Sequence, residues 1–277
     1  MGLRVNTNVL SLNAQRNLSN VSSRIGGNFA RLSSGSRIAV AADDAAGLGV
    51  SERMRAQIRS LSQAGRNAND GISLVQTAES SLSELNNNLV RMRELAVQSA
   101  NGTLSDDDRA VLDTEFTALI SEISRVAADT DFNGVSLFDG TNSSITLQIG
   151  ADNVAANDQI SISLTEVTAG TDGLDVSALS VATDTGAQTA LSAIDTAIDS
   201  VTTFRGDLGA QQNRLQSVVR SIANTTENLT AAESRIRDVD VAYETADLTR
   251  NSILQQAAVS VLSQANQQPQ LALSLLG

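Results

Sequence analysis

The chain has 277 residues, a net charge of −12 and a pI near 4.4. This acidic balance argues against nucleic acid as a partner, because proteins that bind nucleic acid usually carry a basic patch. Cysteine and histidine are absent and all 19 basic residues are Arg. These absences exclude disulfides, thiolate chemistry and Lys-dependent chemistry, and they remove the commonest metal ligand and general base. We therefore predict that the protein is not an enzyme and has no catalytic residues, cofactor or metal site.

Aromatic residues make up only 2% of the chain, and Pro269 is its single proline. A composition that relies on Ala, Leu, Ile and Val suits narrow seams between helices, and long uninterrupted helices are possible upstream of the proline. No apolar run approaches the length of a membrane span, so we expect no membrane insertion. The first residues lack a basic stretch followed by an apolar one, so we expect no cleaved signal peptide. Composition alone would place the protein in the cytosol.

The first 42 residues contain five Arg and no acid. Apolar residues recur there in steps of three and four, which predicts an amphipathic helix. A surface helix packed on its own domain would give the same pattern. The small residues of 33–48, with Gly35, Gly47 and the Asp43-Asp44 pair, predict a connector before the next helix.

A heptad stripe with one phase break covers about 56–99 and predicts a helix about 65 Å long at about 1.5 Å per residue. Asn101-Gly102 is expected to end this helix, and Ser105 followed by three Asp predicts an N-cap with acids in the first turn. A metal site is a weaker alternative for these acids, because three consecutive residues cannot all face one ion on a helix. The second helix is predicted to run antiparallel to the first.

Two short runs with period-two alternation follow, around 145–149 and 160–164, and predict a β-hairpin. The Thr-, Asp- and Gly-rich stretch from Thr165 to Ala187 is expected to be irregular and exposed. A third long helix is predicted over about 189–232, and a last segment begins near Asp238.

That last segment ends in a stretch, Asn251 to Gly277, without a single charged side chain. Its apolar residues predict one apolar helical face, which would aggregate in water unless something covered it. Residues 238–277 carry four acids and one Arg, opposite in sign to the Arg-bearing first helix. We predict that the two terminal helices pair antiparallel as a separate pole, marginal alone and stabilised by further copies. The fold class expected is mainly α: an elongated, coiled-coil-like antiparallel bundle of long helices with a small β-hairpin region.

A series of longer motifs runs along both ends of the chain. On the N-terminal side they are NTNVLSLNAQ (6–15), RLSSGSRI (31–38), DDAAGL (43–48), RNANDGIS (66–73), RELAVQSANGT (93–103) and FNG (132–134). On the C-terminal side they are SRIRDVD (234–240), ILQQA (253–257), VLSQANQQPQ (261–270) and LSLL (273–276). In this order they resemble the terminal patterns of the bacterial flagellins, the subunits of the flagellar filament. The resemblance covers about 1–140 and 187–277.

The resemblance implies a D0 domain built from both termini, here 1–43 plus 237–277. It also implies a D1 domain of long helices, here 44–236, with the hairpin at about 140–187. Because the middle of the chain is too short for outer variable domains, the chain resembles a short D0–D1 flagellin. The implied function is a structural subunit that self-assembles into a filament for swimming motility. The filament is extracellular, and the subunit would leave the cell through a dedicated export apparatus.

The resemblance also implies partners and site residues. The partners are further copies of the chain, an export chaperone on the C-terminal arm, hook-associated and cap proteins, and a Toll-like innate receptor of a host. The apolar stripes and the resemblance together predict self-assembly residues in D0: Val9, Leu12, Leu18, Val21, Ile25, Leu32, Ile253, Leu254, Ala257, Val261, Leu262, Leu273 and Leu276. A D1 patch for lattice contacts and receptor recognition is implied at Arg91, Arg93, Glu94, Leu95, Gln98 and Glu115.

Two other functions stay open at this point. A hook–filament junction protein would have similar termini, although the ending QANQQPQLALSLL favours a flagellin. A non-flagellar coiled-coil adhesin or binding module is the alternative from a different class, and it would not need the uncharged tail.

Overall fold

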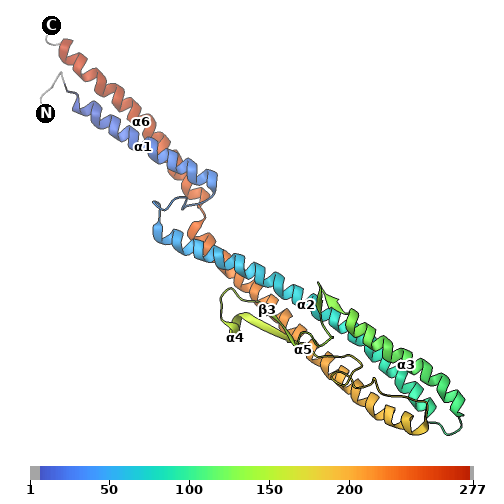
Figure 1. Cartoon of the computed structure of the whole chain (residues 1–277). Helices are drawn as coiled ribbons and strands as arrows, with labels where there is room; N and C mark the ends of the chain where they lie inside the picture. The colour runs from blue at the N-terminus through green and yellow to red at the C-terminus, as the bar shows by residue number, and fades with distance from the viewer. Residues whose placement is uncertain (1–6, 275–277) are drawn as a thin grey trace. The chain divides into compact units, whose positions relative to one another are not determined.

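The computed structural model describes the backbone of residues 7–274 and the side chains of residues 7–268 (Figure 1). The fold is mainly α, with long helices packed against one another and two small antiparallel strand pairs, which confirms the predicted fold class. In chain order the elements are α1 (Val9–Ser34), α2 (Ala45–Ser99), α3 (Asp106–Asp129), β1 (Asp131–Phe132), β2 (Val135–Ser136), β3 (Ser144–Gln148), α4 (Ala155–Asp158), β4 (Gln159–Ser163), α5 (Asp184–Arg237) and α6 (Val241–Ser274).

The chain forms two compact units. Unit 1 comprises Met1–Ala56 and Glu227–Gly277, and unit 2 comprises Gln57–Thr226. Both boundaries fall inside helices, in α2 and in α5. The domain bounds that the resemblance implies, 43/44 and 236/237, lie just before α2 and at the end of α5.

In unit 1, α1 and α6 lie side by side (Figure 1). Gly35 ends α1 in the left-handed conformation, with φ of 69°, which a residue without a Cβ adopts at low cost. The two connectors then join through backbone hydrogen bonds: Arg37 N donates to the Arg237 carbonyl at 2.6 Å, and Val239 N donates to the Gly35 carbonyl at 3.0 Å. α2 begins at Ala45, ahead of the heptad stripe, because the Asp44 carboxylate accepts from Gly47 N at 2.8 Å and caps its first turn.

In unit 2, the predicted cap of α3 is present as a capping box. Ser105 Oγ accepts from Asp108 N at 3.2 Å, and an Asp108 carboxylate oxygen accepts from Ser105 N at 3.1 Å. The hydrogen bond from the Ser105 hydroxyl lowers the pKa of Asp108. The acids of this first turn therefore stabilise a helix end.

The core of unit 2 is the shared apolar seam of α2, α3 and α5. α2 supplies Leu82, Leu85, Leu89 and Met92, α3 supplies Phe116 and Ile123, and α5 supplies Ile194, Val201 and Leu208, all of them fully buried. The heptad stripes of the sequence are thus inward faces, as predicted.

The predicted hairpin is β3 paired with β4. Ile145 lies opposite Ile162, and Leu147 lies opposite Ile160. A second, shorter hairpin joins β1 and β2 through Asn133 and Gly134, whose φ angles of 54° and 78° are those of a tight turn that Asn-Gly adopts readily.

The stretch between Thr165 and Ala187 corrects one expectation. It is largely irregular before α5 begins, and its polar residues are mostly exposed, but its apolar residues are not: Val167, Val176 and Val181 are at most 2% exposed. Asp113 on α3 accepts from Val181 N at 2.7 Å, and Ser99 on α2 donates to the Val181 carbonyl. The valines of this segment and Leu174 pack on the apolar surface of the helix bundle, because packing removes both apolar surfaces from water.

Candidate functional site

The contact between α1 and α6 starts at a polar clamp near the N-terminus of α1. Asn8 donates its amide to the Ala265 carbonyl at 2.7 Å, and Ser11 Oγ donates to Asn266 Oδ1 at 2.7 Å. Ala14 and Ala265 are both less than 10% exposed. Small residues at these positions allow the two helices to approach closely.

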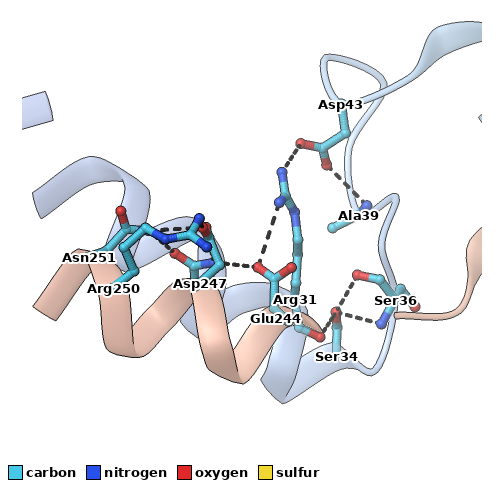
Figure 2. A network of polar contacts seen from close by, with 10 residues as sticks. Arg31, Ser34, Ser36, Ala39, Asp43, Glu244, Asp247, Arg250 and Asn251 are labelled. Atoms are coloured by element: carbon cyan, nitrogen blue, oxygen red, sulfur yellow. Dashed lines mark hydrogen bonds and ion pairs between the residues drawn. The ribbon is translucent and has the colours of Figure 1, made fainter. Parts of the chain in front are cut away.

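A buried polar network holds the other end of the same contact. Asn28, 3% exposed, donates its amide to Glu244 Oε1 at 2.6 Å and to Asp247 Oδ2 at 3.2 Å. Asn251, 2% exposed, donates to Asn28 Oδ1 at 3.0 Å and to Asp247 Oδ2 at 3.1 Å. Figure 2 shows Glu244, Asp247 and Asn251 along successive turns of α6. Buried polar groups of this kind are tolerated only when each finds a partner.

Arg31 extends this network to the connector after α1. Its guanidinium lies 3.6 Å from Glu244 and 3.7 Å from Asp43. Figure 2 shows Arg31 between these two carboxylates. Backbone hydrogen bonds from Val40 and Ala39, together with Arg31, lower the pKa of Asp43. The opposite charges predicted for the two ends of the chain therefore meet at Arg31 and Glu244.

Replacing Asn28 with Ala is expected to loosen the terminal helix pair. The change removes one donor from Glu244, which keeps its pair with Arg31, and one acceptor from Asn251, which keeps Asp247. Each hydrogen bond lost in this way costs about 0.5–1.5 kcal/mol. Hydrogen exchange of the amides of α1 and α6 measures the effect, and their protection should fall. Asn20→Ala is the matched control, because Asn20 is exposed on the same helix and such surface changes stay within about 0.5 kcal/mol. Equal protection in the two variants would contradict a structural role for the network.

The predicted D0 residues divide into two groups. Leu18, Val21, Ile25, Leu32 and Leu262 are half-buried, whereas Val9, Leu12, Ile253, Leu254, Ala257 and Val261 are exposed. The side chain of Leu273 and the whole of Leu276 lie outside the described residues. The sequence predicts one apolar face for the tail. In unit 1 only part of that face packs against α1, and its other apolar side chains are exposed.

The seam of α6 comprises Asn251, Gln255, Ala258, Leu262 and Ala265, which are buried or half-buried. Their steps of four, three, four and three are a heptad pattern that the sequence does contain. Leu262 is one of the predicted site residues, whereas Asn251 and Gln255 are not, because a polar amide does not contribute to an apolar stripe.

Apolar side chains on both terminal helices face outward in unit 1. On α1 and α6 these include Val9, Leu10, Leu12, Phe29, Ile253, Leu254, Val259 and Val261, each between 44% and 60% exposed. Leu10, Phe29 and Val259 were not among the predicted site residues. Exposed apolar surface on this scale marks an interaction site.

A second predicted site, the D1 patch, lies on α2 and α3 of unit 2. Arg91 pairs with Glu115 at 2.8 Å and with Glu94 at 3.0 Å, and the hydrogen bonds from Glu115 and Glu94 raise the pKa of Arg91. Arg93 pairs instead with Asp195 on α5 at 2.6 Å, which raises the pKa of Arg93 and lowers that of Asp195. These side chains are about half exposed, so the patch is a solvated ionic surface.

One member of the predicted patch lies elsewhere. Leu95 is 1% exposed and belongs to the core of unit 2, so its side chain is not part of the surface. Gln98 is exposed, as predicted. Leu95 and the adjacent Ala96 are buried in the core, so they anchor the helix whose Arg93 and Glu94 are exposed.

The described part of the chain contains no group of three or more His, Cys, Asp or Glu side chains arranged to hold a metal ion. None of its described helices combines the length and the apolar character that crossing a bilayer requires.

Comparison with known proteins identifies the family of this chain. Residues 5–143 match the model of the bacterial flagellin N-terminal helical region, and residues 191–276 match that of the bacterial flagellin C-terminal helical region. A flagellin of Halalkalibacterium halodurans is 47% identical over 272 residues, which cover 98% of this chain and 99% of that protein. The flagellin of Bacillus subtilis is 42% identical over 306 aligned residues, covering 99% and 100%.

Two solved structures share the fold. A crystal structure of Bacillus cereus flagellin has a TM-score of 0.51 and 32% identity, covering 61% of this chain and 94% of that one. A putative flagellar hook-associated protein from Vibrio parahaemolyticus has a TM-score of 0.60, covering 71% and 100%, and its 17% identity shows likeness of fold alone. With both terminal family models matched and close relatives aligned over nearly their whole length, the chain belongs to the bacterial flagellin family.

Proposed function

We propose that this chain is a structural subunit that self-assembles into the bacterial flagellar filament for swimming motility. Its family supports this function. The observation that supports this function is the set of exposed apolar side chains on α1 and α6, which unit 1 does not bury. The same helices of further copies can bury these side chains. All copies carry the same apolar surface, so assembly removes it from water on each of them.

The test is seeded elongation of filament fragments by purified protein, followed by electron microscopy. The full chain should elongate the seeds. A variant lacking 251–277 should not, because it loses Ile253, Leu254, Val259 and Val261 of the outward surface together with most of the α6 seam. Circular dichroism should show that the helices of unit 2 remain folded in this variant. Normal elongation by the shortened chain would contradict the proposed role of the tail.

The same experiment separates the two alternatives. A hook–filament junction protein would bind at the hook end and fail to elongate filament fragments. A coiled-coil adhesin or binding module would behave as an unaltered monomer after removal of 251–277.

The family motifs support more specific partners. We infer that the C-terminal arm binds an export chaperone before secretion, that the flagellar export apparatus passes the chain outward, and that hook-associated and cap proteins adjoin the filament. We also infer that the exposed ionic patch of Arg91, Arg93, Glu94 and Glu115, with Gln98, serves lattice contacts and recognition by a host Toll-like receptor. Its exposure and its position beside the α2–α3 contact support this role.

A further inference from the structure

The charges of unit 2 are unevenly distributed along its helices. The unit contains nine Arg and 22 Asp or Glu, a net charge of −13. Four of its Arg nevertheless lie in two segments that contain no acid. We call these two segments the arginine band and define it as residues 57–69 of α2 and 208–226 of α5, with Arg59, Arg66, Arg214 and Arg220.

The two helical segments of the arginine band are neighbours in space. A Cβ added to Gly65 would lie 3.7 Å from the Ile222 side chain. All four Arg side chains are exposed, and no ion pair to any of them is present in the described part of the chain. Arg66 donates to Gln63, a neutral residue of its own helix. Among the described residues of one copy, the four positive charges therefore have no ionic partner.

The apolar seam beneath these arginines is incompletely covered. Ile58, Leu61, Val218 and Ile222 are only half-buried, whereas Leu82 and Leu85 further along α2 are fully buried. The band thus combines unpaired cations with apolar surface that α2 and α5 alone do not bury. This combination is typical of a contact surface for another chain.

An acidic groove of about 390 Å³ lies elsewhere on unit 2, between α2 and the end of α3. Glu84, Asp129 and Asp131 line it against a single cation, Arg125, which already pairs with Asp129 at 3.3 Å and with Glu122. Hydroxyl groups supply most of the remaining lining: Thr77, Ser80, Ser81 and Thr130. Carboxylate and hydroxyl oxygens in a groove of this size are suitable acceptors for the five N–H donors of a guanidinium.

The arginine band and the acidic groove cannot neutralise each other within one copy. Arg66 and Glu84 are 18 positions apart on the continuous helix α2, which separates them by about 27 Å at 1.5 Å per residue. Charges this far apart are screened, because the Debye length is about 8 Å at physiological ionic strength. Pairing between the two surfaces therefore requires a second molecule.

We propose that the arginine band of one copy docks on the acidic groove of a second copy. This inference rests on the proposed function, since it assigns a contact within the self-assembled filament. The proposed contact joins two different surfaces of the chain, a cationic one at one end of unit 2 and an anionic groove further along α2. Each copy can therefore contact two neighbours, one through each surface.

Charge reversal tests the docking in seeded elongation. The band variant is R59E/R66E and the groove variant is E84R/D129R, all four at exposed helix positions where the new residues are good helix formers. Each variant alone brings like charges together, so the concentration needed for elongation should rise at least about tenfold. An equimolar mixture of the two variants should elongate nearly as well as wild type, because the reversed band of one then faces the reversed groove of the other.

The matched control for the groove variant is D199R/D207R, which makes the same change in net charge at exposed positions of α5 outside the groove. It should elongate within about twofold of wild type, as expected for charges outside a contact. Three results would each overturn the docking. The band variant could elongate like wild type, or the control could be as defective as the groove variant. The mixture could also fail to elongate while both proteins keep their helical signal. Failure of the wild-type chain to elongate seeds would instead overturn the proposed function.

Discussion

Replacing Val261 with Asp is expected to stop filament elongation while the fold of a single subunit stays intact. Val261 is 54% exposed on α6, so the carboxylate remains solvated in the monomer. In an assembled filament the outward face of α6 would be covered, and an unpaired carboxylate buried there would cost at least about 3 kcal/mol. That cost corresponds to a critical concentration more than about 100-fold higher. Sedimentation of polymer after seeding measures it.

Two neighbouring variants make this result specific. Val261→Ala keeps the surface neutral and should raise the critical concentration far less than Val261→Asp does. Leu262→Asp places the charge in the half-buried seam, so it should lower the hydrogen-exchange protection of α1 and α6 as well as assembly. Normal filaments from Val261→Asp would contradict the view that the outward face of α6 is covered by other copies.

Phe138→Ala is expected to be the most damaging single truncation in unit 2. Phe138 is fully buried and meets Phe204 of α5 edge to face, with ring centroids 6.0 Å apart and an interplanar angle of 77°. Truncating a buried Phe to Ala costs about 3–5 kcal/mol. For a unit of this size each kcal/mol lowers Tm by about 2–4 °C. Calorimetry should therefore show a fall of about 10 °C in the unfolding of unit 2.

The control for this truncation is Val111→Ala, because Val111 is 71% exposed and its loss should change the free energy of unfolding by less than about 0.5 kcal/mol. A double-mutant cycle of Phe138→Ala and Phe204→Ala should yield about 0.5–1.5 kcal/mol of coupling for the ring pair. A shift as small as that of Val111→Ala would mean that the loop carrying Phe138 contributes little to the core. Because the chain has few aromatic residues, this pair is a large share of its aromatic packing.

Local patterns were enough to predict most of the helices and the hairpin. The stripe of Leu82, Leu85 and Leu89 on α2 is a heptad signal, and its period states which face turns inward. Ser105 and the acids after it marked the start of α3, since capping depends on residues next to one another in sequence. Alternation around Ile145 and Ile162 likewise predicted a paired strand on each side of a turn.

Patterns failed where burial depends on partners distant in sequence. The Thr- and Gly-rich stretch before α5 has the composition of an exposed loop, yet Val176 and Val181 are fully buried because the helices beneath present an apolar surface. The polar seam is a second case. Asn28 and Asn251 look like solvent-facing residues, and only the juxtaposition of α1 and α6, with Asp247 accepting from both, makes them interior groups.

The sequence by itself determined that this protein is a mainly α flagellin without His, Cys or Lys, because composition, helical period and family motifs are local properties of the chain. Only the tertiary structure decided which apolar residues of the terminal helices pack in unit 1 and which remain outward. The same holds for the arginine band, whose two halves are far apart in sequence and adjacent in space. The physical reason is that a helical pattern states which residues share a face, whereas the face becomes buried or exposed only when another element packs against it.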